Sequence, residues 1–250
     1  DKKSVQKIIV DKKIFGNENI DVYSALNIGY IFDHGAVRGA GVSICSICEN
    51  NRNKNIIFHA ICTDLTKDDI DKLEQISIKY NKLIFLYFIN KNVELFKNLV
   101  IGKFPVTIWY RILLPYIVNC KKILYLDADI INLSSLEKLF SIDMEDYDLL
   151  AVPDIEKTAN ERIKALDLTN NIYFGVLMIN IDKWVENNNS DKILEIAKIY
   201  NEKLILPDQD ALNILFSKSK QVYYIDRKYN RVALWKEKNI KEKLEETVLL

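Results

Sequence analysis

The chain lacks a net charge and lacks any long uninterrupted apolar segment. Its 35 basic and 35 acidic residues cancel, so electrostatics gives no argument for a nucleic-acid partner. No apolar run approaches the roughly 20 residues that a membrane-spanning helix needs, and the N-terminus, DKKSVQKIIVDKK, has no signal-peptide core. We therefore expect a soluble, cytoplasmic protein. With 49% hydrophobic and 28% charged residues over 250 positions, the composition fits one sizeable α/β core.

Histidine and cysteine, common ligands of transition metals, are also scarce. Of the four cysteines, Cys45 and Cys48 form a Cys-x-x-Cys in GVSICSIC, but no second Cys or His pair completes a zinc site. We expect buried, reduced thiols there. His59, in IIFHAI, is expected to be a hydrogen-bonded core residue. His34 is a weak candidate ligand, because it directly follows Asp33.

Apolar runs alternate with segments of helical period along the chain. This alternation predicts an α/β fold with a mixed, mostly parallel sheet flanked by helices. Thr66 is the expected N-cap of the second helix. The expected strands are 27–32, 56–61, 83–89, 123–126, 149–152 and 175–181, and the expected helices are 37–48, 67–80, 107–118, 183–200 and 208–216.

Asp-x-Asp occurs four times, and its context separates one copy from the others. Asp127 and Asp129 directly follow the apolar run 123–126, which is typical of a strand buried on both faces. In open α/β sheets, ligands bind beyond the carboxyl ends of such strands. Residues i and i+2 of an extended segment point the same way, so both carboxylates can bind one divalent cation.

The other three copies begin helices or enter a strand. The first opens a helix, where acidic residues are favourable, and the second lies in a solvated turn. In the third, LPDQDALN, Asp208 follows a proline and can either cap the helix or project from its start. Helix capping accounts for one aspartate in this segment but does not account for its other polar residues. These copies are Asp69/Asp71, Asp146/Asp148 and Asp208/Asp210.

Several motifs occur in one order: NIGYIFD, FPVTIWYRILLPYI, KILYLDADI, FGVLMINIDKW, LPDQDALN and KYN. Together they resemble the bacterial lipopolysaccharide galactosyl/glucosyltransferase family of retaining glycosyltransferases, which includes glycogenin. The resemblance spans residues 27–230 and is strongest to enzymes of the lipopolysaccharide outer core. It implies a single GT-A-type nucleotide-sugar-binding domain over 27–235. An N-terminal extension over 1–26 would precede this domain, and residues 236–250 would begin a truncated C-terminal region.

The resemblance implies a role for each matching residue. Asp33 would contact the uracil, Arg111 the diphosphate region, and Asp154 the donor-sugar hydroxyls. Asp208 and Gln209 would be catalytic, with Gln209 near the anomeric carbon. Solvent exposure remains the alternative for Arg111. The nucleotide and metal site would be formed by Asp127, Ala128 and Asp129, with Asp127 and Asp129 as metal ligands.

The implied reaction is transfer of glucose or galactose from a UDP-sugar to a lipopolysaccharide core sugar, with an α-linkage. Carboxylates and phosphates are hard oxygen ligands, so Mn²⁺ or Mg²⁺ suits the site. Retention by double displacement needs a carboxylate nucleophile. Because Gln209 is an amide, we expect a front-face mechanism that Gln209 supports electrostatically.

Two departures from the family keep alternatives open. Tyr173 and Phe174 stand where relatives have an asparagine and a small residue that bind the donor sugar. Relatives also carry a metal-binding histidine in a segment beyond the position of Leu250, and EETVLL resembles a strand leading into it. A truncated chain, whose missing tail docks on the inner membrane, explains this. A catalytically defective nucleotide-sugar binder and a glycogenin-like glucosyltransferase are the alternatives.

Overall fold

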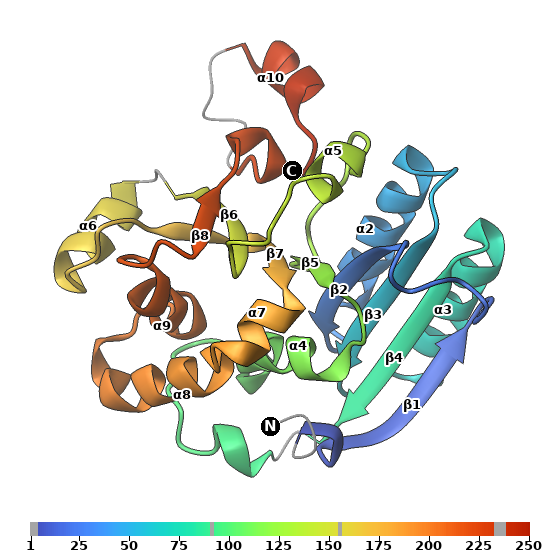
Figure 1. The fold of residues 1–250 in the computed structure, drawn as a ribbon. Helices are drawn as coiled ribbons and strands as arrows, with labels where there is room; N and C mark the ends of the chain where they lie inside the picture. Colours follow the sequence, from blue (N-terminus) through green and yellow to red (C-terminus); the bar gives the residue numbers. More distant parts are fainter. Residues whose placement is uncertain (1–4, 91–92, 155–156, 233–238) are drawn as a thin grey trace.

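The strands form one mixed sheet. The computed structural model describes residues 5–90, 93–154, 157–232 and 239–250. Within these ranges the strand order is β1-β4-β3-β2-β5-β7-β6-β8 (Figure 1). Strands β4, β3, β2 and β5 are parallel neighbours, as are β6 and β8, whereas β1 and β7 are antiparallel to their neighbours. The strands are β1 (Ile9–Phe15), β2 (Leu26–Phe32), β3 (Ile56–Cys62), β4 (Leu83–Ile89), β5 (Lys122–Leu126), β6 (Leu149–Pro153), β7 (Ile172–Asn180) and β8 (Val222–Tyr224).

Helices cover both faces of the sheet, which confirms the predicted α/β architecture. Helices α2 and α3 lie on one face, and α4, α7, α8 and α9 lie on the other (Figure 1). The α-helices are α2 (Val37–Asn50), α3 (Lys67–Tyr80), α4 (Leu114–Ile117), α5 (Glu137–Phe140), α6 (Lys157–Ala165), α7 (Ile181–Glu186), α8 (Asn189–Ile199), α9 (Pro207–Phe216) and α10 (Ile240–Glu246). The 3₁₀ helices are η1 (Glu94–Phe96), η2 (Val106–Leu113), η3 (Asn201–Lys203) and η4 (Arg227–Tyr229).

Strand β5 is buried on both faces, as its continuous apolar run predicted. Ile123 and Tyr125 point into the core formed with η2, α7, α8 and α9. Leu124 and Leu126 point into the opposite core, formed with α2 and α3. Successive side chains of a strand alternate between its two faces. The Tyr125 side chain therefore points toward η2, and the residues that directly follow β5 begin near this side chain.

The first Asp-x-Asp copy is structural, as expected. The Thr66 side chain accepts a hydrogen bond from the Asp69 backbone N–H, and the Asp69 carboxylate accepts one from the Thr66 N–H, which forms a capping box at the start of α3. Asp71 forms an exposed ion pair with Lys67 at 2.6 Å. The second copy differs from the prediction of a solvated turn: Asp148 is 1% exposed and accepts hydrogen bonds from Asn187 and Asn189.

Two predicted helices are wrong in detail. The segment 107–118 is the 3₁₀ helix η2 followed by α4, because Pro115 has no N–H to give the Arg111 carbonyl, and the N–H of Leu114 bonds that carbonyl instead. The helix predicted over 183–200 is divided into α7 and α8. Asn188 has a left-handed backbone with φ of 52° at the break, where buried Asp148 holds the flanking asparagines.

Three further features concern the ends of the chain and the membrane. Residues 9–15, within the expected N-terminal extension, form the edge strand β1, which was not predicted. The boundary expected at 235/236 lies outside the described residues. The EETVLL segment finishes α10 and then pairs with residues 131–133, including two backbone hydrogen bonds between Ile131 and Leu250. In the described ranges, no helix is long and apolar enough to cross a membrane.

Candidate functional site

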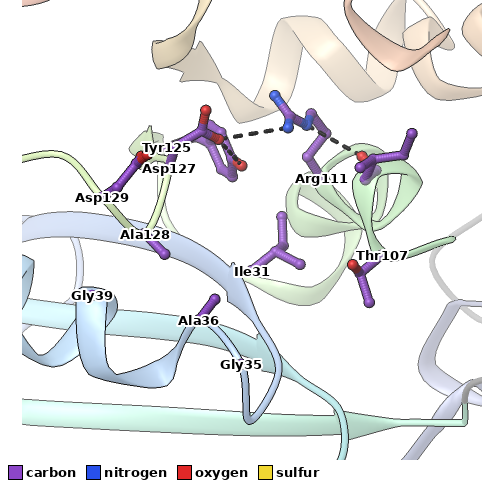
Figure 2. A pocket seen from close by; sticks show the side chains of 11 residues that line it. Ile31, Gly35, Ala36, Gly39, Thr107, Arg111, Tyr125, Asp127, Ala128 and Asp129 are labelled. Carbon is purple, nitrogen blue, oxygen red and sulfur yellow. Dashed lines mark hydrogen bonds and ion pairs between the residues drawn. The ribbon is translucent and has the colours of Figure 1, made fainter. Parts of the chain in front are cut away.

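A cavity of about 400 Å³ opens beyond the carboxyl ends of β2 and β5 (Figure 2). These two strands are parallel neighbours, with Gly29 paired to Tyr125, so the loops that follow them meet at one edge of the sheet. This is the position at which open α/β sheets bind ligands. The cavity is lined by Ile31, Gly35, Ala36, Gly39, Thr107, Ile108, Arg111, Tyr125, Asp127, Ala128 and Asp129.

Asp127 and Asp129 both line this cavity, as predicted, but they lie in a turn. The N–H of Ile130 bonds to the Asp127 carbonyl at 3.2 Å, so the expectation of an extended Asp-x-Asp segment is wrong. The Asp127 side chain is 37% exposed, and Asp129 is an exposed residue. The Asp127 side chain is thus partly covered by the protein, whereas the Asp129 side chain faces solvent at the edge of the cavity (Figure 2).

Arg111 joins the Asp-x-Asp turn to the start of α9. Its Nε lies 2.9 Å from Oδ2 of Asp208, and its Nη2 lies 3.5 Å from Oδ1 of Asp127. The side chains of Arg111 and Asp208 are 12% and 11% exposed, so the alternative of a solvent-facing arginine is wrong. Asp208 projects from the first turn of α9, while Asp210 accepts the hydrogen bonds of the Ile205 and Leu206 N–H groups.

Two aromatic rings hold the Arg111 guanidinium. Its central carbon lies 4.8 Å from the centre of the Tyr125 ring and 5.4 Å from the centre of the Phe174 ring. Guanidinium groups are attracted to aromatic faces. Tyr125 also donates a 2.6 Å hydrogen bond to Oδ1 of Asp127, and Figure 2 shows this bond beside the Arg111 ion pair. The two ring contacts and the ion pairs therefore restrict the position of the guanidinium.

The charges in this cluster influence one another. Burial raises the pKa of Asp127 and of Asp208, and the Arg111 cation opposes the rise in both. Burial alone would lower the pKa of Arg111, but the two carboxylates raise it above its ordinary value. Arg111 therefore stays a cation. It stabilises the Asp208 carboxylate, which is otherwise costly to bury, and the partly exposed Asp127 carboxylate to a lesser degree.

Helix α2 forms the opposite wall of the cavity. The Asp33 carboxylate accepts a 3.2 Å hydrogen bond from the Ala36 N–H, so Asp33 lies at the turn into α2, next to two cavity-lining residues. A Cβ placed on Gly39 would lie 2.9 Å from the Ala128 carbonyl oxygen. Gly39 therefore lets α2 approach the Asp-x-Asp turn closely.

Four of the predicted site residues do not line this cavity. One of them, Asp33, lies at the turn into α2 beside it. Asp208 reaches it through Arg111, and Gln209 is a half-buried residue beside Asp208 in the first turn of α9. Asp154, which follows β6, is 8% exposed and accepts hydrogen bonds from Arg162 and Asn171.

Neither histidine faces the cavity. His59 is buried and hydrogen-bonded to Asn27 at 3.0 Å and to Tyr87 at 3.2 Å, as predicted. Burial lowers its pKa to about 3. His34 pairs with Asp69 at 2.7 Å. The predicted thiols are free: Cys48 is buried and Cys45 is half-buried.

The residues at the cavity fit a hard divalent cation bound together with a ligand. Across the described ranges, no group of three or more His, Cys, Asp or Glu side chains could hold a metal ion. Mg²⁺-type sites commonly use one or two carboxylates, with waters and substrate phosphates completing the shell. A Cβ at Gly175 would lie 3.5 Å from Oδ2 of Asp127, so the glycine leaves space beside this oxygen.

Sequence reasoning missed the residues that support Arg111 and the Asp-x-Asp turn. Tyr125 had a usable signal, because it is two residues before Asp127 in an alternating strand and so shares its face. Phe174 was noted as a departure from the family, not as a partner of Arg111. The contact of Gly39 with Ala128 is between backbone segments far apart in sequence, and no local pattern indicates it.

Fold and site together define an α/β protein with a carboxylate- and arginine-lined pocket at the carboxyl edge of its sheet. The profile of glycosyl transferase family 8 matches residues 22–250. The chain belongs to this family. A lipopolysaccharide 1,2-glucosyltransferase of Escherichia coli is 32% identical over 220 residues, covering 84% of this chain and 64% of that protein. A lipopolysaccharide 1,3-galactosyltransferase of Salmonella typhimurium is 28% identical over 82% of this chain and 63% of that protein.

The chain thus spans less than two thirds of the length of these relatives. Among solved structures, the galactosyltransferase LgtC in complex with donor and acceptor sugar analogs has a TM-score of 0.70 and 24% identity, over 82% of this chain and 74% of that one. The bifunctional glycosyltransferase WbbM has a TM-score of 0.73 and 17% identity, over 94% of this chain and 46% of that one. These similarities confirm the predicted GT-A-type fold.

Proposed function

We propose that this protein is a metal-dependent, retaining glycosyltransferase that moves glucose or galactose from a UDP-sugar to a lipopolysaccharide core sugar, forming an α-linkage. The observation that carries the proposal is the position of Arg111. It joins Asp127, of the Asp-x-Asp turn, to Asp208, of the helix that also bears Gln209. The names of the similar enzymes support the substrate class.

The cavity residues have distinct tasks in this proposal. Asp33, at the entry to α2, binds the uracil, and the Asp127–Ala128–Asp129 turn binds the nucleotide side of the donor. Asp127 and Asp129 would hold Mn²⁺ or Mg²⁺, which would supply Lewis-acid stabilisation of negative charge on the diphosphate. Arg111 places a permanent positive charge near the same group.

The sugar side of the donor faces the start of α9 in this proposal. As the bond to the diphosphate breaks, positive charge develops on the sugar ring. Asp208 and the Gln209 carbonyl oxygen stabilise that charge electrostatically, and Asp154 binds sugar hydroxyls. Gln209 is an amide and a poor nucleophile, so the acceptor hydroxyl attacks from the face that the diphosphate leaves, and the diphosphate takes its proton.

The proposal also includes a place for the enzyme in the cell. A basic, aromatic tail would hold the cytoplasmic enzyme at the inner-membrane surface. Absence of the protein at its natural length from membrane fractions would contradict this point.

Donor turnover by the protein at its natural length tests the proposal. UDP-glucose and UDP-galactose are offered separately with Mn²⁺ and a lipopolysaccharide core oligosaccharide, and UDP release and the anomer of the product are measured. We expect transfer of one hexose with an α-linkage, and loss of about 10²–10³ in kcat for Gln209→Ala. Asp146→Asn, which changes the exposed aspartate of another Asp-x-Asp copy, is the matched control.

The alternatives predict different results in the same assay. A catalytically defective relative binds the UDP-sugar but releases no UDP above background. A glycogenin-like enzyme labels a tyrosine of its own chain and needs no oligosaccharide. A β-linked product would refute the retaining mechanism.

A further inference from the structure

A second buried charge cluster lies next to the site. Of its three members, Arg162, Asp154 and Asp210, only Asp154 was a predicted site residue. Arg162, on α6, is 8% exposed. Its Nη2 lies 3.2 Å from Oδ2 of Asp154, and its Nε lies 3.3 Å from Oδ1 of Asp210. Asp210 is fully buried at 0% exposure. One guanidinium thus connects two carboxylates from separate elements, the end of β6 and the first turn of α9.

Each carboxylate is also bound to the backbone or the side chains of its own region. Oδ2 of Asp210 accepts hydrogen bonds from the Ile205 and Leu206 N–H groups, at 2.8 and 2.9 Å, and so fixes the entry to α9. Asp154 accepts a 3.0 Å hydrogen bond from the Asn171 side chain, and its N–H donates to the Asn171 carbonyl. A movement of Arg162 would therefore change the positions of both the entry to α9 and the Asp154 carboxylate.

These two places carry the residues assigned to the donor sugar. Asp208 and Gln209 lie one or two positions before Asp210 in the same helical turn, and Asp154 is itself a partner of Arg162. Arg162 thus links Asp154 to the helical turn that carries Asp208 and Gln209. Asn213 of α9 also hydrogen-bonds to Ile172, but that link does not involve the Asp154 carboxylate. The nucleotide side of the site, formed by Asp127 and α2, makes none of these contacts.

We propose that Arg162 is a positioning residue for the donor sugar, and that it acts by holding Asp154 in register with the start of α9. This inference rests on the proposed function. An arginine suits the task because its planar, delocalised guanidinium donates a hydrogen bond to Asp154 and pairs by charge with Asp210 at the same time, whereas lysine is a single point charge. Without a cation between them, the two buried carboxylates repel each other.

The test compares UDP with the UDP-hexose, because only the second has a sugar to position. Dissociation constants of both are measured by calorimetry with Mn²⁺ for the natural-length protein, Arg162→Lys and Arg162→Gln. We expect the UDP-hexose to bind about 10-fold to 100-fold more weakly in both variants, the range typical for supporting residues behind a binding group. UDP should change by no more than about twofold.

The control is Arg52→Lys, because Arg52 also pairs with a carboxylate, that of Glu49, but at the surface, with the two side chains 73% and 41% exposed. It should leave both affinities unchanged. The KM for donor hydrolysis should rise in Arg162→Lys more than kcat falls. Should Arg162→Gln fail to fold, as judged by circular dichroism, Arg162→Lys decides alone, since it keeps the buried positive charge.

The outcomes separate the two proposals. If the unaltered protein binds neither UDP-hexose, the proposed function fails and this inference fails with it. If the unaltered protein binds the UDP-hexose but Arg162→Lys keeps the same ratio of UDP-hexose to UDP affinity, the positioning role is wrong. Equal weakening of UDP and UDP-hexose also overturns it, because that result indicates a general structural role.

Discussion

Replacing Arg111 by methionine should destabilise the protein far more than replacing an exposed arginine. The guanidinium lies 2.9 Å from Asp208, and both side chains are about one-tenth exposed. At an effective dielectric of about 20, a contact of this length has a gross attraction of about 5–6 kcal/mol. Desolvation offsets part of this attraction, but methionine leaves Asp208 buried without its cation, which costs about 3–5 kcal/mol in comparable buried pairs. The contact with Asp127 adds little, because that carboxylate is 37% exposed.

Urea unfolding without metal or nucleotide measures this cost free of ligand effects. We expect Arg111→Met to lower the free energy of unfolding by about 3 kcal/mol or more, and Arg52→Met by less than about 1 kcal/mol. Adding Asp208→Asn to Arg111→Met should recover about 2 kcal/mol, because it removes the unpaired carboxylate. If the two arginine variants are equally stable, or if the costs of Arg111→Met and Asp208→Asn simply add, the ion-pair reasoning is refuted.

Three more changes test other parts of the account. His59, with a pKa near 3 when folded and about 6.5 when unfolded, takes up its proton mainly in the unfolded chain. Stability should therefore fall as pH drops through this window, by about 2 kcal/mol from pH 7 to pH 5, and His59→Gln should flatten the urea-derived profile; an unchanged slope contradicts this. Gly39→Ala should lower the free energy of unfolding by about 1–3 kcal/mol and weaken UDP binding, because the new Cβ contacts the Ala128 carbonyl. Unchanged UDP affinity in calorimetry would show that the Asp-x-Asp turn moves to accept the Cβ without loss of binding. Phe174→Ala should loosen Arg111 and raise the KM for the UDP-sugar, because it removes a cation–π contact of about 0.5–2 kcal/mol. Phe174→Leu keeps most of the side-chain volume, so it separates the effect of lost packing from that of the lost cation–π contact. Equal KM values in Phe174→Ala and the unaltered protein would show that the aromatic clamp of Arg111, formed by the Tyr125 and Phe174 rings, does not contribute to binding.

Local patterns were sufficient to predict most of the sheet and the Asp-x-Asp site. The run 123–126 is apolar at every position because β5 has a core on each face, and such a run identifies a central strand. Thr66 was correctly placed as an N-cap, because capping depends on residues three positions apart. Once this strand is predicted, the position of its carboxyl end is known, and Asp127 and Asp129 directly follow that end.

Features that depend on distant contacts were not predictable from local patterns. The break between α7 and α8 depends on Asp148, about 40 positions earlier, which holds Asn187 and Asn189. Strand β1 has a charged centre, DKK, and forms an edge; edge strands often carry such charges and lose the apolar alternation that identifies a strand.

The site shows the same division. The resemblance identified Arg111 and Asp208 separately, but their ion pair depends on η2 and α9 belonging to the same hydrophobic core. The aromatic clamp brings together Tyr125 and Phe174, from two antiparallel strands, and the Arg162 cluster joins three elements. Their geometry is tertiary, so sequence spacing carries no signal for it.

The most direct measurement is calorimetric binding of UDP-glucose and UDP-galactose with and without Mn²⁺, for the unaltered protein, Asp127→Asn/Asp129→Asn and Asp146→Asn. We predict metal-dependent binding of one sugar nucleotide that is retained in Asp146→Asn and is at least about tenfold weaker in the double variant, a loss of 1.4 kcal/mol or more. Binding that needs neither the metal nor the two aspartates would contradict the proposed nucleotide-sugar site.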